Sequence, residues 1–445
     1  MATANRMKKG TDSLPSYSWE EINKHSEKSS RWIVIDREVY DVTNWSKKHP
    51  GGSSVLGHSA GQDATEVFQA MHRNNLSYVN KFLRPLKIGR LEDSEVVPHM
   101  DIRQDFAKLE KTAAKMGLFD ASFTFFAIVF LHIVVFDIAS YLVLRYYGSG
   151  WIPWMISITL FTTAQVQMGW HHHDAGHLSI FKNNTLNRFY HKLLICLMKG
   201  TCSHWWNHLH YQHHAKPNVI GKDPDVRVEA LFVVGNVMPV ETAKSQEKVT
   251  MPYNWQHRYF LIIGPPLLFP VYFQFMNFRH AYTRKLWLEL AVMVSFYVRI
   301  YLMYAPLLGG LWGFLLYYEI NRVLESTWFT WVSQTNHIPM TVEKDESHSA
   351  NTWLTAQLKA TCNVEKSFFN DWFTGHLNFQ IEHHLFPQMP RHNLYKIAPL
   401  VKSLCEKHDV TYKVKSLKAG FLDVISSLKK SGELWLHTYN EFHPM

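Results

Sequence analysis

Cysteine is scarce in this chain, and the few cysteines lie outside the usual motifs. No two of them are spaced as CxxC within the 445 residues. Disulfide frameworks and cysteine metal sites both need closely spaced cysteines, so the sequence favours neither, and a reducing compartment fits. The four cysteines are Cys196, Cys202, Cys362 and Cys405.

A cleavable signal peptide is also missing. Residues 1–30 are polar and charged and contain no apolar stretch of the kind that a secretory signal carries. We therefore expect the N-terminus to stay in the cytosol.

Long basic runs are absent too, although the chain is basic overall. Lys and Arg number 46 against 37 Asp and Glu, which gives a formal net charge of +9. A multi-span membrane protein that faces an anionic leaflet has a similar excess, so the charge does not require a nucleic-acid partner. We expect the lipid bilayer as a partner and no nucleic acid.

The apolar residues gather in the middle of the chain. Hydrophobic residues make up 47% of the sequence, yet the mean hydropathy is only -0.18, because the ends are polar. Two apolar stretches, 121–147 and 151–170, are separated only by Gly-Ser-Gly at 148–150, which predicts a hairpin of membrane helices. Three more stretches follow, at about 259–278, 286–304 and 308–331.

The number of membrane crossings follows from the histidine-rich segments that flank these stretches. If those segments all lie on one side of the membrane, an even number of crossings must separate them. One of the last three stretches must then be re-entrant, interfacial or buried. We predict four crossings, with both termini in the cytosol.

The N-terminal part has a different pattern. Short β-rich runs at 32–35 and 39–42 alternate with polar helical stretches, which is typical of a small α+β domain. We therefore expect this domain over residues 16–93, a charged linker over 94–120, and an all-α membrane domain over 121–445.

A haem site is predicted within the first domain. The sequence His-Pro-Gly-Gly begins at His49, and a second histidine, His72, follows an acidic helical stretch. Two loop histidines can ligate one haem iron from opposite faces, and the glycines let the backbone pass close to the porphyrin. Residues 32–91 resemble cytochrome b5 in this signature. His58 lies outside the pattern and is expected to be exposed.

Histidine is abundant, with 27 residues, and seven of them lie in three short motifs. Residues 173–177 read HDAGH, 210–214 read HYQHH and 380–384 read QIEHH. Spacings of three and four residues place imidazoles on one face of a helix, where they can chelate a metal. The candidate ligands are His173, His177, His210, His213, His214, His383 and His384, with His337 as an eighth imidazole.

Seven or eight imidazoles are too many for one metal ion. Two iron ions explain the set, because dioxygen must receive electrons in pairs before it attacks an unactivated C–H bond. Zinc has no redox chemistry and would not explain an attached haem donor. Gln380 begins the third motif, where the second motif has His210, and His376 is expected on the same helical face as Gln380.

Together these features resemble the front-end acyl desaturases, membrane enzymes with an N-terminal cytochrome b5 domain and three histidine boxes, of which the third begins with Gln. The resemblance covers nearly the whole chain. The segments 213–218 (HHAKPN), 251–254 (MPYN) and 376–387 (HLNFQIEHHLFP) are similar to the vertebrate group of Δ6 acyl-CoA desaturases.

The resemblance implies both the fold and the reaction. The expected fold is a cytochrome b5-like α+β domain followed by about four transmembrane helices with a cytosolic, histidine-rich cap, in the endoplasmic reticulum membrane. The reaction inserts a cis double bond into an unsaturated fatty acyl-CoA, as a step of polyunsaturated fatty acid biosynthesis. Electrons come from NADH through NADH-cytochrome b5 reductase and haem b, and O2 is the oxidant at two non-haem irons. The implied catalytic residues are His173, His177, His210, His213, His214, Gln380, His383 and His384.

Two departures from the family pattern lie beside the first box. Family members usually have an aromatic residue or leucine where this chain has Ala175, and Leu-Gln where it has His171 and His172. These positions are expected to lie at the rim of the catalytic site and to bear on regioselectivity.

Other functions share the same motifs. A sphingoid-base desaturase or a lipid hydroxylase would start from the same iron–oxygen chemistry, and ligand motifs do not separate these reactions. A catalytically silent paralogue that binds lipid or a partner desaturase is the alternative of another class.

Overall fold

The structure, a computed structural model, describes residues 14–245, 251–345 and 352–443. Contacts divide the chain into two compact units, with the boundary between Pro98 and His99. The first unit contains strands and short helices, and the second is mostly helical. The predicted order of an α+β unit and a helical unit is therefore confirmed.

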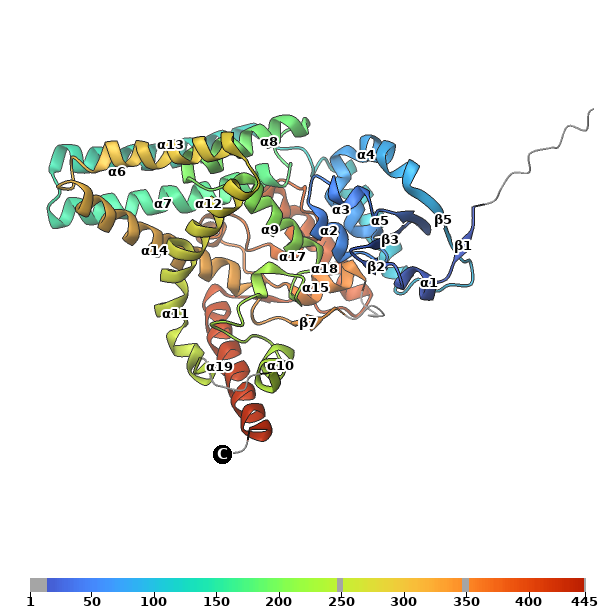
Figure 1. Ribbon diagram of the computed structural model, residues 1–445. Coiled ribbons are helices and arrows are strands. Elements are labelled where there is room, and N and C mark those ends of the chain that lie inside the picture. Colours follow the sequence, from blue (N-terminus) through green and yellow to red (C-terminus); the bar gives the residue numbers. More distant parts are fainter. Residues whose placement is uncertain (1–13, 246–250, 346–351, 444–445) are drawn as a thin grey trace, which may run out of the picture. The chain divides into compact units, whose positions relative to one another are not determined.

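The first unit is built on a five-stranded sheet with the order β1-β5-β4-β3-β2 (Figure 1). Strands β3 and β4 form an antiparallel hairpin in which Trp32 pairs with Asp41. The turn residues Asp36 and Arg37 have φ values of 51° and 64°, and two positive φ values in a row are typical of a type I′ hairpin turn. The strands are β1 (Ser16–Tyr17), β2 (Ser26–Glu27), β3 (Ser30–Ile35), β4 (Glu38–Asp41) and β5 (Lys87–Leu91).

Four short helices complete the first unit. They are α1 (Trp19–Asn23), α2 (Ser53–His58), α3 (Thr65–His72) and α4 (Leu76–Leu83). His49 lies in the turn before α2, as expected, but His72 is the last residue of α3 rather than a loop residue. His58 was expected to be exposed and is buried instead, because the chain turns into the interior after α2, where Ser59 and Ala60 are also buried.

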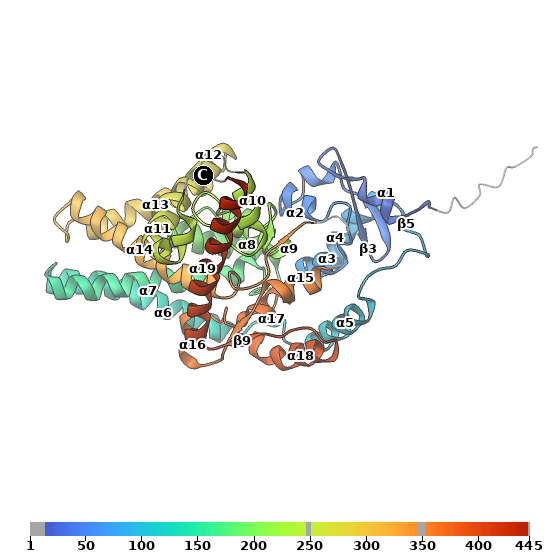
Figure 2. The same ribbon diagram turned by 90° about the horizontal axis from the view of Figure 1, so that it is seen from below.

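Four long helices lie side by side in the second unit (Figures 1 and 2). Helices α6 and α7 form the predicted hairpin, and Gly148 between them has a φ of 78°, which favours glycine. Helix α7 continues past the expected end at residue 170, so the first histidine box lies at the end of the same helix. The four helices are α6 (Phe123–Tyr147), α7 (Trp151–Gly176), α13 (Trp287–Tyr304) and α14 (Leu311–Thr335).

Among the described residues, three helical stretches are long and apolar enough to cross a membrane. Two of them are α6 and α13, and the third, Tyr253–Thr283, contains α11 (Gln256–Leu267) and α12 (Gln274–Thr283). Side chains on α6 such as Ile128 and Leu131 are exposed in the protein alone, as expected for surface that faces lipid. Helix α11 packs against α14 and against the C-terminal helix α19 (Leu417–Phe442).

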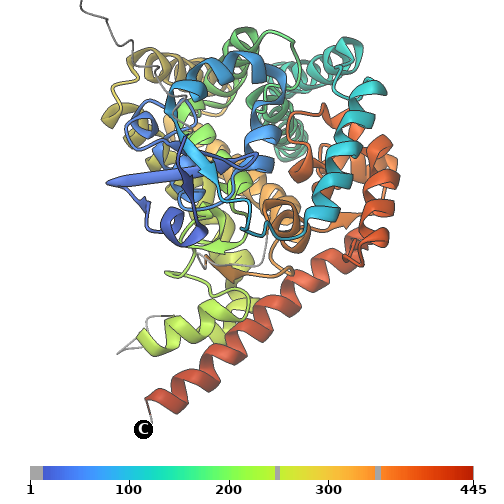
Figure 3. The ribbon, with the colours of Figure 1, turned by 90° about the vertical axis from the view of Figure 1, so that its right-hand side faces the viewer.

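Shorter elements surround the end of α7. Helix α10 lies beside α19 (Figure 3), and α5, in the segment expected to be a linker, packs against α18. The remaining helices are α5 (Met100–Lys115), α8 (Asn184–Lys192), α9 (Ser203–Ala215), α10 (Val237–Ser245), α15 (Trp353–Ala360), α16 (Phe368–Phe373), α17 (Gln380–Leu385) and α18 (Leu394–Lys407). Two short parallel pairs join β6 (Val219–Ile220) to β7 (Glu343–Lys344) and β8 (Asn363–Val364) to β9 (Val414–Lys415).

Candidate functional site

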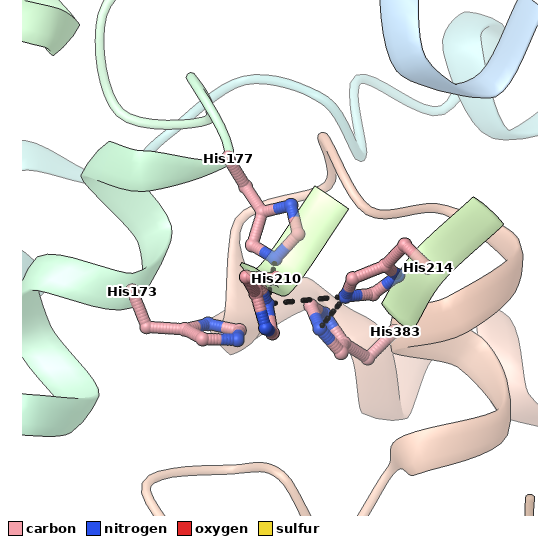
Figure 4. Close-up of side chains that lie close together, drawn as sticks. All are labelled: His173, His177, His210, His214 and His383. Atoms are coloured by element: carbon pink, nitrogen blue, oxygen red, sulfur yellow. Dashed lines mark hydrogen bonds between the residues drawn. The ribbon is translucent and has the colours of Figure 1, made fainter. Parts of the chain in front are cut away.

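Five imidazoles from three helices point toward one another at the end of α7 (Figure 4). His173 and His177 lie at the end of α7, His210 and His214 on α9, and His383 on α17. One candidate ligand atom from each lies within 4.8 Å of all the others. We call these residues the five-histidine group.

Nitrogen atoms face one another in the five-histidine group. Nε2 of His210 lies 2.7 Å from Nε2 of His177 and 3.2 Å from Nε2 of His214. Nε2 of His383 lies 3.0 Å from Nε2 of His214. Two imidazole nitrogens bound to one metal ion, each at about 2.1 Å and at roughly a right angle, lie about 3 Å apart. The spacing therefore fits a shared metal ion.

A second group consists of His213, His337 and His384, whose candidate ligand atoms also lie within 4.8 Å of one another. We call it the three-histidine group. It contains the eighth imidazole, His337, which follows α14. Because successive helical residues point about 100° apart, His213 and His214 face different groups, and so do His383 and His384. The expected one-faced clusters are thus divided between two positions.

Each imidazole of the three-histidine group has an acceptor at Nδ1. Nδ1 of His213 lies 2.9 Å from a carboxylate oxygen of Asp223, and Nδ1 of His337 lies 3.0 Å from the backbone oxygen of Ala360. Nδ1 of His384 lies 2.8 Å from Oε1 of Gln357. An acceptor at Nδ1 holds the proton there and leaves Nε2 as the lone pair that can bind a metal.

The buried imidazoles are held neutral, with one exception. Burial, aided by the charge of His213, lowers the pKa of His337 to about 3, and burial also holds the pKa of His214 and of His384 well below the usual value. For His213 burial acts in the same direction, but the carboxylates of Asp223 and Asp225 raise its pKa to about 9. A neutral imidazole can bind metal directly, and His213 can do so through Nε2 once that nitrogen loses its proton, while Nδ1–H still donates to the Asp223 carboxylate.

Gln380 faces the three-histidine group. Its amide nitrogen lies 2.9 Å from Nε2 of His337 and 3.3 Å from Nε2 of His384, while its Oε1 is buried and has no hydrogen-bond partner among the described residues. The amide can be turned to bring the oxygen toward the same two nitrogens, since its two orientations have nearly the same shape. A buried amide oxygen beside two imidazole lone pairs fits a metal ion at this position.

The two histidines of the first unit also face each other. Their ring centroids are 6.1 Å apart. A metal–imidazole bond of about 2 Å, with the centroid about 1 Å beyond, places two rings on opposite sides of one iron about 6 Å apart. Nδ1 of His72 lies 2.9 Å from the oxygen of Phe68, and Nδ1 of His49 lies 3.4 Å from that of Gly52, so Nε2 of each ring is available. Burial, aided by the charge of His72, lowers the pKa of His49 to about 4. The pair fits a haem iron.

The family departures beside the first box belong to neither histidine group, although Trp206, which contacts His172, also stacks on His210. Nε2 of His171 lies 2.8 Å from the hydroxyl of Tyr190, and the His172 ring packs edge-on against Trp206. Ala175 is fully buried in an apolar cluster with residues of α6. Ala175 therefore belongs to neither histidine group, and this face of α7 packs against α6.

Other histidines near the boxes lie outside both groups. His376 has a φ of 64° and precedes α17, so it does not share a helical face with Gln380, and its ring contacts Phe125 instead. Nδ1 of His204 lies 3.2 Å from Nε2 of His280, and the His208 ring is also close to His280.

Sequence reasoning missed the residues that support the ligand candidates. Asp223 and Gln357 follow no helical spacing rule relative to the boxes, because Asp223 lies beyond the end of α9 and Gln357 lies on α15, which contains no box. Asp174 is another such residue. Its Oδ1 accepts a hydrogen bond of 3.0 Å from the backbone nitrogen of Arg391, which ties the first box to the chain beyond the third.

Comparison with known proteins assigns two parts of the chain to known families. Residues 149–416, more than half of the chain, match the fatty acid desaturase family, and residues 18–92 match the cytochrome b5-like heme/steroid binding domain. A solved structure, cytochrome b5 of Ostreococcus tauri virus 2, is 34% identical over 17% of this chain and 95% of its own length, with a TM-score of 0.16.

Proposed function

Because this chain belongs to the fatty acid desaturase family and has a cytochrome b5-like domain before the desaturase domain, we propose that it is a front-end acyl-CoA desaturase. The family makes it an oxygen-dependent oxidoreductase, and the two domains imply haem and a di-iron centre. The proposal adds that the substrate is an unsaturated fatty acyl-CoA and that the product serves polyunsaturated fatty acid synthesis.

The observation that carries the proposal is the pair of histidine groups, which bring eight imidazoles to two adjacent positions. We assign the five-histidine group to one iron and the three-histidine group, with Gln380, to the other. When bound, the two irons supply paired electrons to dioxygen, which can then oxidise an unactivated C–H bond. The protein supplies neutral imidazoles, holds the protons of three of them at Nδ1, and keeps the site buried. His49 and His72 hold the haem that receives electrons.

The membrane arrangement is part of the same proposal. We assign α6, α7, α13 and α14 to the four crossings, since they are long and lie side by side. The α11–α12 stretch is long and apolar enough to cross, whereas α7 and α14 are less apolar. An even number of crossings is needed to keep the histidine boxes on one side, so we assign the α11–α12 stretch to an interfacial or re-entrant position. Both termini then lie in the cytosol, where NADH-cytochrome b5 reductase can reach the haem domain. The endoplasmic reticulum is the membrane that fits this electron supply.

The proposed function is tested by expressing the full chain in yeast fed with defined polyunsaturated acids. We expect a new cis double bond on the carboxyl side of an existing one, detected by gas chromatography of fatty acid derivatives. Iron content and oxygen consumption on addition of an acyl-CoA are measured on the purified protein. If a hydroxylated fatty acid or a desaturated sphingoid base is found instead, the protein catalyses that reaction and not the proposed one. Iron-containing protein that consumes no oxygen would indicate a silent paralogue.

Gln380 is expected to matter for reactivity more than for assembly. Replacing it with Ala or His should leave most of the iron, because all eight imidazoles remain. Desaturation should fall about 10-fold or more, because a weak amide at the three-histidine group is lost or replaced by a strong ligand. Metal analysis and product yield are measured on the same preparations.

A buried glutamine on α9, Gln212, provides the control for Gln380. It lies within the second box, but its side chain donates to the backbone oxygen of His208 at 2.6 Å. Gln212→Ala should retain both iron and product. Normal product yield from both Gln380 variants would show that Gln380 has no role in the reaction. Loss of iron from Gln380→Ala would show that it is a structural metal ligand.

A further inference from the structure

Gln357 lies between the two histidine groups and contacts a member of each. It is on α15, and its side chain is fully buried, with 0% of the residue exposed. Its Oε1 lies 2.8 Å from Nδ1 of His384, in the three-histidine group. Its Nε2 donates to the backbone oxygen of His214, in the five-histidine group, at 3.0 Å. One amide therefore bridges both groups.

The hydrogen bonds fix which atom of Gln357 faces which partner. A backbone oxygen can only accept, so the atom of Gln357 that faces His214 must be the amide nitrogen. The amide oxygen then faces Nδ1 of His384, which must carry the proton. Nε2 of His384 is left as a lone pair, and this nitrogen is the one that lies beside Gln380. Gln357 thus selects the metal-binding tautomer of His384.

Helix α15 supports both groups through two further residues. Nε1 of Trp353 donates to the same His214 oxygen at 3.0 Å, so this oxygen accepts two bonds from one helix. The oxygen of Ala360, at the end of α15, accepts from Nδ1 of His337. The helix contains none of the histidine boxes, yet its hydrogen bonds reach His214, His337 and His384.

We infer that Gln357 is a positioning residue for the di-iron centre, which holds His384 in its metal-binding tautomer and ties it to His214. The inference rests on the proposed function, because it concerns the metals that the two groups are proposed to hold. Hydrogen-bond partners of metal-bound histidines typically contribute about 10- to 100-fold in metal affinity or activity. Loss of the Gln357 hydrogen bonds should therefore lower the affinity of the three-histidine group for iron by a factor in this range.

Two substitutions separate the two hydrogen bonds. Gln357→Leu removes both of them, and iron in the full-length protein should fall from two toward one per chain on dialysis against a chelator. Gln357→Glu keeps an oxygen acceptor for His384. It should therefore retain close to two irons, but with an altered Mössbauer signal from one of them, because a carboxylate makes the imidazole more basic. Haem stays at one per chain in both variants.

Gln256 provides a matched control for the loss of a buried glutamine. It is also 0% exposed, accepts from the backbone nitrogen of Val233 at 2.9 Å and donates to the oxygen of Leu428 at 2.7 Å, and neither partner belongs to a histidine group. Gln256→Leu should lower the melting temperature about as much as Gln357→Leu does. The folded fraction of Gln256→Leu should nevertheless keep two irons per chain.

Three results would overturn the inference. They are two irons with an unchanged Mössbauer spectrum in Gln357→Leu, equal iron loss in Gln256→Leu, and iron loss from Gln357→Glu as large as that from Gln357→Leu. Wild-type protein without iron would instead contradict the proposed function itself, so the two failures are distinguishable.

Discussion

Replacing His384 with alanine should abolish desaturation and remove iron while the haem content stays at one per chain. His384 is 0% exposed, and its ring lies in van der Waals range of His213 and His337, with centroids 4.9 Å away from each. Loss of one of three imidazoles leaves that position with too few strong ligands to retain iron. Iron and haem are measured on the same purified protein, and product is measured in yeast.

A nearby histidine outside both groups gives the control for His384. His376 lies four residues before Gln380, and its ring contacts Phe125 rather than any candidate ligand. His376→Ala should keep both irons and measurable product. Retained activity in His384→Ala would show that the third box is structural and would remove the assignment of the three-histidine group.

Much of the site could be predicted because its signals are local. The spacings within residues 173–177, 210–214 and 380–384 place imidazoles within one or two turns of a helix, and the structure places all three boxes at the ends of helices or on them. The hairpin of α6 and α7 was predictable for the same reason, since Gly148 allows a tight turn between two apolar stretches. The His-Pro-Gly-Gly sequence likewise predicted the turn at His49.

The division of the boxes between two metal positions could not be predicted. Neighbours such as His213 and His214 point in different directions, and only the tertiary structure decides that His214 meets His383 while His213 meets His337. Gln357 was missed because it lies 27 residues from His384, and Asp223, ten residues after His213, was missed because it lies beyond the end of α9, where helical spacing no longer applies. His376 was misplaced because its positive φ ends the helical register before α17 begins.

The haem pair gives the second test with a large expected effect. Replacing His49 with alanine should remove haem from the full-length protein and abolish NADH-driven desaturation, while iron stays at two per chain. His49 and His72 face each other with centroids 6.1 Å apart, and each has a backbone oxygen near its Nδ1. One remaining imidazole cannot hold a low-spin, six-coordinate haem.

Reduced-minus-oxidised absorption spectra, pyridine haemochrome content and reduction by NADH with cytochrome b5 reductase measure this loss. His58 on α2 is the matched control, because it is a buried histidine of the same unit but lies outside the facing pair. His58→Ala should keep one low-spin haem per chain, since both axial ligands remain. An unchanged haem spectrum in His49→Ala would remove the haem assignment from His49. Iron should be retained in that variant, because the two metal sites draw on separate sets of histidines. Iron loss would contradict this separation.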